Sequence, residues 1–274
     1  LTQLDLDDFN VLESAELIPV WNEVHVKTVD TFKNLTKDKT SAVIYQQLFY
    51  SHLYNFNDFY VLYTDGSKFN NHVASAVVHS AGVLSEKLPS NFSVFSSECY
   101  AILLALQFLS KQMHKKWFIF SDSKSCIDAI KNFSSKSHST KPHILNLYIE
   151  LTNNNYEIIF GWIPGHMGIK GNETADSIAK STHNLTNKPH CLPDIRNLVA
   201  ESLTQLRQAN WNNEINNKLH EIKSDIKPFA PLTNYNRKTQ VLINRLRIGH
   251  TRLTHYLILN EAPPQCNFCK ESLT

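Results

Sequence analysis

The chain has 274 residues, with 27 basic and 25 acidic side chains and a hydrophobic fraction of 42%. These values are typical of a globular protein with one sizeable core plus extensions, or with two domains. No apolar run approaches the roughly 18 residues that a membrane span needs, so the sequence predicts a protein without a membrane anchor.

Charge and cysteine content vary along the chain. Residues 1–58 are acidic, residues 184–274 are basic, and every arginine lies at or after Arg196. The five cysteines form no even framework, which favours a reducing compartment. We therefore expect an intracellular protein, nuclear or cytoplasmic rather than secreted, with an anionic partner. No signal peptide is visible and the chain begins at Leu1, so we expect a fragment of a longer polypeptide.

The first predicted elements are one helix and three strands. A helix is expected at Lys39–Tyr54, in a segment whose function the sequence does not reveal. Strand-like composition marks Phe59–Thr64, His72–His79 and Gly82–Lys87. The turn sequences "NN" and "SAG" separate them, so we expect an antiparallel meander.

Helices and strands alternate in the next part of the chain. Ser96–Lys111 is predicted as a helix with Ser96 or Ser97 as its N-cap. The runs "WFIFSD" and "YEIIFGWIP" are predicted as buried strands. Further helices are predicted at Ser123–Phe133, Pro142–Asn153 and Gly171–Ser181. This order predicts an α/β fold in which a mixed five-stranded sheet is flanked by helices.

Beyond residue 184 the pattern is basic and mainly helical, which predicts a helical C-terminal extension. Helices are expected at Asp194–Ile222, Asn234–Ile248 and His250–Leu259. We therefore divide the chain into an N-terminal extension of unknown function (1–58), an α/β domain (59–183) and a basic tail (184–274).

Two aspartates follow buried strands in the same way. Asp65 comes directly after Phe59–Thr64, and Asp122 follows the run "FIFS". If these strands are parallel neighbours, the two carboxylates lie side by side at the carboxyl ends of the strands, where open α/β sheets bind ligands. Carboxylates so close repel each other and share a proton unless a cation neutralises them. Taken alone, Asp65 is also compatible with the first polar residue of a turn at Gly66.

Two more carboxylates lie on helix faces that are otherwise apolar or small. Glu98 has Ala101 at i+3, and Asp176 has Ala179 at i+3. Glu98 is also compatible with a favourable position at a helix N-terminus. Residues 59–183 contain no arginine, so hard divalent ions are the best counter-charge. Zinc is disfavoured because no His/Cys cluster lies nearby in the sequence. Two ions roughly 3.5–4 Å apart are a known device for in-line phosphoryl displacement.

Four motifs in order carry a resemblance. "YTDGS", "SSECYAILLAL", "FSDSKS" and "WIPGHMGIKGNETAD" resemble the type 1 ribonuclease H domain, over about residues 59–183. The second and fourth motifs and the tail "NRLRIGHTRLTHYLILNEAPPQCNFC" are similar to non-LTR retrotransposon polyproteins. The resemblance implies a ribonuclease H-like fold and an endonuclease that cuts the RNA strand of RNA–DNA hybrids. It also implies a reverse transcriptase tethered in the full polyprotein, whereas the oligomeric state stays unknown.

The resemblance also implies roles for the matching residues. Asp65, Glu98, Asp122 and Asp176 would hold two Mg²⁺ ions, with Mn²⁺ as an alternative, and Asp65 would bridge both. His166, ten residues before Asp176, would assist proton transfer or product release. A surface loop histidine is the simpler alternative for His166. The residues implied to line the RNA strand are Gly66, Ser67, Ser96, Ser97 and Lys124.

The chain ends in Cys266-Asn-Phe-Cys269, a spacing typical of half a zinc site. Zinc needs four ligands, and His250 and His255 are candidates for the others. A solvated cysteine pair is equally compatible. The basic helices before it are compatible with nucleic-acid binding, although we prefer an amphipathic packing helix with a solvated face.

Two other functions fit the same motifs less well. A non-catalytic hybrid-binding or scaffolding remnant would be favoured by the loss of a carboxylate, but all four are present. Another nuclease of the same fold, such as an integrase or exonuclease, is disfavoured by the run Asp65-Gly66-Ser67 together with His166.

Overall fold

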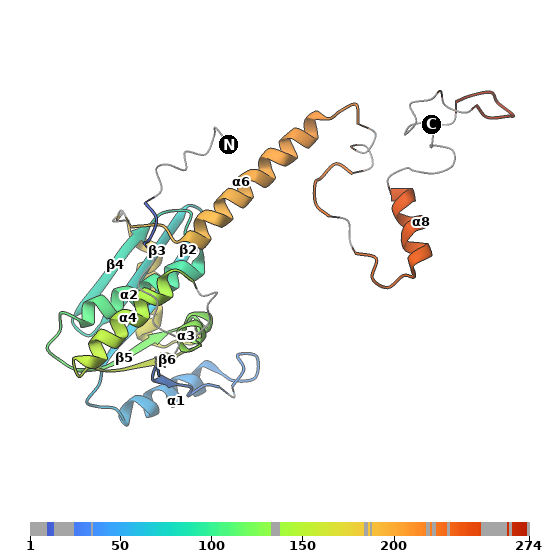
Figure 1. Ribbon diagram of the computed structural model, residues 1–274. Coiled ribbons are helices and arrows are strands. Elements are labelled where there is room, and N and C mark those ends of the chain that lie inside the picture. The colour runs from blue at the N-terminus through green and yellow to red at the C-terminus, as the bar shows by residue number, and fades with distance from the viewer. Residues whose placement is uncertain are drawn as a thin grey trace. The chain divides into compact units, whose positions relative to one another are not determined.

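The computed structural model describes residues 10–13, 25–33, 35–132, 138–183, 186, 188–217, 220, 223–228, 231–247, 262 and 265–272. The chain divides into two compact units, Leu1–Leu198 and Val199–Thr274. The first unit contains the sheet and the helices packed on it (Figure 1). Among the described helices, none has an apolar stretch long enough to cross a bilayer.

Six strands form one mixed sheet, in the spatial order β1-β6-β5-β2-β3-β4. Their bounds are Thr28–Val29 (β1), Tyr60–Phe69 (β2), His72–His79 (β3), Gly82–Leu88 (β4), Lys116–Ser121 (β5) and Glu157–Trp162 (β6). β3 pairs antiparallel with β2 and β4, whereas β2, β5, β6 and β1 pair in parallel. The predicted α/β fold and its mixed sheet are confirmed. β1 is an additional edge strand of two residues, too short to leave a pattern in the sequence.

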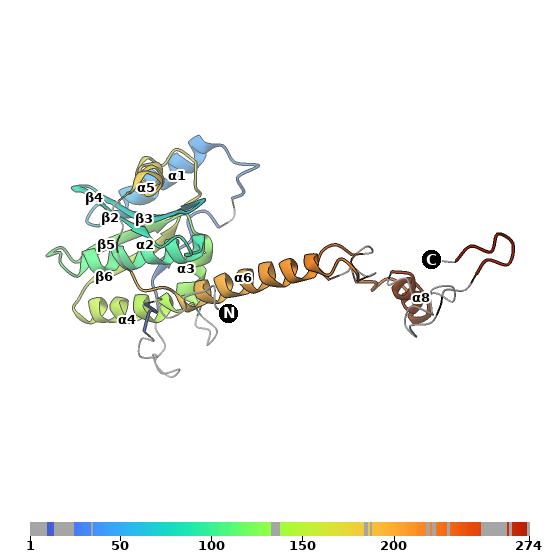
Figure 2. The same ribbon diagram turned by 90° about the horizontal axis from the view of Figure 1, so that it is seen from above.

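Helices cover both faces of the sheet. Those of the first unit are α1 (Ala42–Tyr54), α2 (Val94–Leu109), α3 (Lys124–Lys131), α4 (Thr140–Asn153) and α5 (Lys170–Ser181). α2, α3 and α4 lie on one face, and α1 and α5 lie on the other (Figure 2). The sequence predicted all five, with ends that differ by a few residues.

Each face of the sheet has its own apolar core because successive side chains of a strand point to opposite faces. Trp117 and Ile119 of β5 belong to the core under α2 and α4, whereas Phe118 and Phe120 belong to the core under α1. The second core is strongly aromatic, and the ring centroid of Phe49 in α1 lies 5.0 Å from that of Phe120. The N-terminal segment therefore supplies much of the apolar core on one face of the sheet.

α2 begins earlier than the sequence predicted. Its N-cap is Ser93, whose hydroxyl accepts the backbone N–H of Ser96 at 3.1 Å. The prediction of Ser96 or Ser97 as N-cap was wrong because each nearby serine offers a suitable capping hydroxyl. Glu98 consequently lies in the second turn of α2, so a favourable position at the helix N-terminus does not account for it.

β2 does not stop at Gly66. Asp65 pairs with Ala76 of β3, and the strand continues beyond Gly66. The prediction of a strand end was wrong because only β5 ends there, at Ser121, while β3 goes on pairing with β2. The need for glycine has another cause. A Cβ at Gly66 would lie 2.3 Å from the backbone nitrogen of Glu98, so α2 can approach β2 this closely only over a glycine.

Two helices are described after residue 190. α6 (Leu192–Asn213) begins in the first unit, and α8 (Arg237–Arg247) lies in the second. The prediction that α6 extends to Ile222 was wrong. The helix ends within the sequence "NNEINN", because asparagine side chains compete with the helix for backbone hydrogen bonds. The predicted helix at His250–Leu259 lies outside the described residues.

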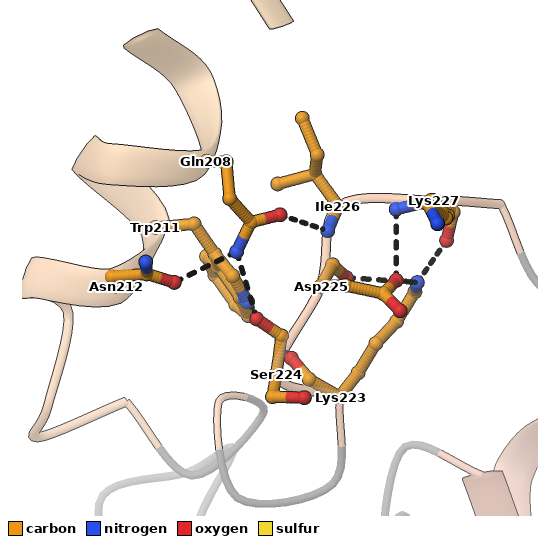
Figure 3. Close-up of polar contacts among 8 residues, drawn as sticks. All are labelled: Gln208, Trp211, Asn212, Lys223, Ser224, Asp225, Ile226 and Lys227. Atoms are coloured by element: carbon orange, nitrogen blue, oxygen red, sulfur yellow. Dashed lines mark hydrogen bonds and ion pairs between the residues drawn. The ribbon is translucent and has the colours of Figure 1, made fainter. Parts of the chain in front are cut away.

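A polar cluster ties the chain that follows α6 back to that helix (Figure 3). The indole N–H of Trp211 donates to the Lys223 carbonyl at 2.8 Å. The side-chain amide of Gln208 donates to the Ser224 carbonyl and accepts the Ile226 N–H, both at 2.9 Å. These bonds satisfy backbone groups in a segment that has no regular secondary structure.

Candidate active site

Two aspartates meet where β5 ends beside β2. Thr64 pairs with Ser121 in the parallel register, so Asp65 and Asp122 are the next residues along the two strands. Carboxyl oxygens of Asp65, Glu98 and Asp122 all lie within 4.8 Å of one another. The structure therefore brings together three of the four carboxylates singled out in the sequence, at the sheet edge where α/β folds bind ligands.

Glu98 reaches this group from α2. Its side chain is only 7% exposed, and its Oε2 atom has no hydrogen-bond partner among the described residues. Burial, together with the charges of Asp65 and Asp122, raises the pKa of Glu98 well above its usual range. A buried carboxylate of this kind is costly, and a bound cation would relieve the cost.

The pKa values of the two strand aspartates, Asp65 and Asp122, are raised in the same way as that of Glu98. Asp65 is 5% exposed, and burial with the charges of Asp122 and Asp176 raises its pKa to about 7. Burial also raises the pKa of Asp122, while a hydrogen bond from Asn172 and the charge of His166 oppose the rise. Near neutral pH these carboxyl groups therefore compete for protons unless a cation binds among them.

Asp176 joins the site from α5, where it is partly buried. Its negative charge raises the pKa of both strand aspartates. Its Oδ2 atom lies 2.7 Å from the ammonium group of Lys180, one turn further along the helix. α5 comes this close to β2 over Gly171, where a Cβ would lie 2.2 Å from the Tyr63 ring.

The sequence analysis missed two residues that touch the site. Asn172 is 3% exposed and donates its amide N–H to Asp122 Oδ2 at 3.4 Å. Lys37 donates to the Gly165 carbonyl at 3.0 Å, and its charge lowers the pKa of Asp122. Asn172 lies four residues before Asp176 on the same helix face, a spacing that could have revealed it. Nothing in the local sequence marks Lys37.

His166 is exposed on the loop between β6 and α5. Its φ of 59° is left-handed, a conformation in which histidine is more common than most residues. A Cβ at the preceding Gly165 would lie 2.5 Å from Asp122 Oδ2, so this loop runs directly over the carboxylates. Gln46 of α1 holds the loop by donating to the Met167 carbonyl at 2.9 Å.

Most residues predicted to line the RNA are buried in this structure. Ser96 and Ser97 have no exposed surface, and their hydroxyls form hydrogen bonds within the protein. Ser67 is also buried. Lys124 is exposed, with its ammonium group 5.6 Å from the centroid of the Trp162 ring. Contact between these residues and RNA stays a prediction.

The tail cysteines lie in a turn closed by pairing between Gln265 and Ser272. The backbone N–H groups of Cys269 and Phe268 lower the pKa of the Cys266 thiol. Cys269 is exposed. Within the described part of the chain, no third ligand residue joins this pair, and the two histidines named as candidates lie outside it. The zinc half-site therefore stays a prediction.

Comparison with known families is consistent with this geometry. Residues 57–184 match the family model described as RNase H. A search of curated proteins gave no significant match. RNase H domains typically use a divalent metal, and Asp65, Glu98 and Asp122 could bind one here. Residues 57–184, a little under half of the chain, are therefore similar to RNase H domains, which belong to the nuclease class of hydrolases.

Proposed function

We propose that the protein is an endonuclease that hydrolyses the RNA strand of RNA–DNA hybrids with two divalent metal ions. The observation that carries this proposal is the cluster of Asp65, Glu98 and Asp122 within 4.8 Å. None of these three carboxylates forms an ion pair with a lysine or arginine of the described residues. Hard oxygen ligands favour Mg²⁺, with Mn²⁺ as a substitute.

The residues of the site have positions that suit distinct tasks. The four carboxylates would hold the cations. Bound cations would supply positive charge to the phosphate oxygens and lower the pKa of a water molecule. Asn172 orients Asp122 through its amide N–H. His166 would accept or donate a proton at the edge of the site, a role supported by its exposure on the loop over Asp122.

RNA would be recognised through its 2′-hydroxyls and its A-like sugar geometry, so cleavage should depend little on base sequence. Lys124 supports this proposal as an exposed cation at the start of α3, two residues after Asp122. Its ammonium group lies over the Trp162 ring, and the Trp162 indole donates to the Asp122 carbonyl at 3.0 Å. A phosphate bound by Lys124 would therefore lie next to the carboxylate cluster.

We further propose that the chain is part of a retrotransposon polyprotein in which this domain is tethered to a reverse transcriptase. The resemblance of two motifs and of the tail supports this origin. Tethering would raise the local concentration of the domain at its substrate without new contacts. The protein would then act inside the cell, in the nucleus or cytoplasm.

The proposal is tested by incubating the full chain and Mg²⁺ with a labelled RNA–DNA hybrid, single-stranded RNA and double-stranded RNA. We expect cleavage of the RNA in the hybrid alone, with 5′-phosphate and 3′-hydroxyl ends. The Asp65→Asn variant is the control for a contaminating nuclease. Binding of the hybrid without cleavage would identify a non-catalytic remnant, and equal cleavage of all three substrates would identify a different nuclease.

A further inference from the structure

A second cluster of ligand-type side chains lies where α6 begins. A ring nitrogen of His138, the sulfur of Cys191 and a carboxyl oxygen of Asp194 all lie within 4.8 Å of one another. Cys191 and Asp194 are 1% and 2% exposed, and His138 is partly buried. None of the three takes part in the carboxylate cluster.

One helical turn presents two of these side chains. The Cys191 carbonyl accepts the N–H of Asp194 at 3.0 Å and that of Ile195 at 3.2 Å, which starts α6. Pro193 fits this first turn because a proline there leaves no N–H unpaired. His138 comes from the segment just before α4, so the fold assembles the cluster from distant parts of the sequence.

Asp194 has one satisfied carboxyl oxygen and one that is not. Its Oδ1 atom accepts the Ser93 N–H at 3.1 Å. Its Oδ2 atom is buried and has no hydrogen-bond partner among the described residues, and no described lysine or arginine forms an ion pair with it. A buried carboxylate oxygen without a partner is costly, so this position suits a cation.

His138 is oriented by two hydroxyl groups. Its Nε2 atom lies 2.9 Å from Ser96 Oγ, and its Nδ1 atom lies 2.7 Å from Thr140 Oγ1. A cation bound at one ring nitrogen would displace the hydroxyl that now contacts it, while the other ring nitrogen would donate its N–H to the remaining hydroxyl. Outer-shell hydrogen bonds of this kind fix the orientation of metal-binding histidines.

The same three residue types also make nucleophilic triads, but the structure argues against that chemistry. Cys191 is buried, so a substrate cannot reach its sulfur. Burial, together with the negative charge of Asp194, raises the pKa of the thiol to about 11. Reactive cysteines have the opposite properties, a lowered pKa and an accessible sulfur.

We propose that His138, Cys191 and Asp194 form a structural zinc site that fastens the start of α6 and the segment before α4 to the N-terminus of α2. Sulfur, nitrogen and oxygen ligands together suit Zn²⁺, whereas the all-carboxylate cluster suits harder ions. Structural zinc is four-coordinate, so a water molecule or a neighbouring hydroxyl would have to complete the set of three protein ligands.

The test uses the full chain with Cys266→Ser and Cys269→Ser, which removes the tail cysteines as ligands. The probe is Co²⁺, because a cobalt–thiolate bond gives a near-ultraviolet absorption that carboxylate ligands cannot give. We expect one thiolate-bound Co²⁺ per chain, displaced by Zn²⁺. Adding Cys191→Ser should abolish the absorption, whereas Cys126→Ser, a matched change at another buried cysteine, should preserve it.

A second variant, Asp194→Asn, tests the proposal independently in case Cys191→Ser does not fold. Asp194→Asn keeps the shape of the side chain and an oxygen for the Ser93 N–H, and circular dichroism would check the fold. Loss of an outer-shell partner alone costs about 10–100-fold in metal affinity, so loss of this ligand should weaken Co²⁺ binding by at least about 100-fold. Absence of the thiolate absorption in the parent, or an unchanged signal in Cys191→Ser or Asp194→Asn, would overturn the proposal. The readout is absorbance, so it is independent of nuclease activity.

Discussion

The carboxylate cluster and the His138–Cys191–Asp194 cluster each contain a buried carboxyl oxygen without a hydrogen-bond partner among the described residues, yet they differ in donor atoms and in access. Asp122 and Asp176 are partly exposed, whereas Cys191 and Asp194 are almost fully buried. Oxygen ligands at an open sheet edge suit ions that must also contact a substrate, whereas sulfur and nitrogen ligands in a closed place suit an ion that stays. Donor type and access together therefore separate a metal site for chemistry from one for structure.

α2 takes part in both clusters. It carries Glu98 into the first, and its cap residue Ser93 and first-turn residue Ser96 contact Asp194 and His138 of the second. The two clusters therefore share a framework while holding different ligands. The predictions below test whether they act separately.

The largest effect should come from the carboxylate cluster, because we assign it, and not the His138–Cys191–Asp194 cluster, to cleavage. Asp65→Asn should lower single-turnover cleavage of a labelled hybrid by at least about 10³-fold, because metal ions supply several kcal/mol of transition-state stabilisation. Hybrid binding should persist. Asp128→Asn, an exposed aspartate on α3, is the matched control and should cleave at the parental rate. A loss of less than about tenfold in Asp65→Asn would rule out the two-metal assignment.

The next largest effect should come from the loop over the carboxylates. His166→Ala should lower kcat by about 10²–10⁴-fold, the usual contribution of a general acid–base group. Steady-state kinetics would measure it, with His143→Ala as a control away from the site. An unchanged kcat would make His166 an ordinary surface histidine, and a loss as large as that of Asp65→Asn would make our ranking of roles wrong.

The carboxylate cluster should also make the stability of the metal-free protein depend on pH. The pKa of Asp65 is raised from 3.8 to about 7, so the folded state binds this proton more tightly than the unfolded chain. With a chelator present, stability should therefore fall as pH rises from about 4 to about 7. At pH 8 and without metal, the free energy of unfolding of the Asp65→Asn variant should be larger than that of the parent by roughly 1–3 kcal/mol.

Urea unfolding with a chelator across this pH range would measure the difference between Asp65→Asn and the parent. Mg²⁺ should raise the stability of the parent more than that of Asp65→Asn, because the variant lacks a ligand. Identical pH profiles for the two proteins would show that Asp65 does not carry the proton.

A smaller effect is expected from the basic second unit. Removing residues 199–274 leaves both clusters in place and takes away ten basic and six acidic side chains. The KM for hybrid should rise severalfold with little change in kcat, since phosphate contacts dominate nucleic-acid affinity and its salt dependence. Measurements from about 50 to 200 mM salt would show equal slopes if this unit does not touch the substrate.

The smallest effect on cleavage is expected from Asp194→Asn, which tests whether the two clusters act independently. Asp194→Asn should change kcat for hybrid cleavage by less than about threefold, because residues of independent sites act additively. Its thermal stability should respond less to Zn²⁺ than that of the parent. A large loss of cleavage in a folded Asp194→Asn protein would mean that the two clusters are coupled through α2.

The sheet and the carboxylate cluster were accessible from the sequence because their signals are local. Strand composition and a carboxylate at each strand end placed Asp65 and Asp122 at one edge of the sheet. The α2 N-cap was missed because Ser93, Ser96 and Ser97 all fit the capping rule. The end of β2 was misplaced because pairing with β3, a tertiary effect, overrides the tendency of Gly66 to break a strand.

The second cluster could not be predicted from sequence spacing. The sequence analysis found no His/Cys cluster, because His138 and Cys191 are far apart in the chain and only the fold brings them together. Lys37 and Gln46 were missed for the same reason. Their partners are backbone carbonyls of a distant loop, which leave no pattern in the sequence.

The packing of α1 sets a boundary that sequence similarity does not show. The family match begins at residue 57, after α1 has ended, yet α1 covers Phe118 and Phe120 of β5. A fragment cut at the edges of the match would expose an aromatic surface and be prone to aggregate. It would also lack Lys37 and Gln46, whose side chains donate hydrogen bonds to backbone carbonyls of the loop that carries His166. The smallest part of the chain that keeps this core and this loop intact is therefore larger than the segment that similarity detects.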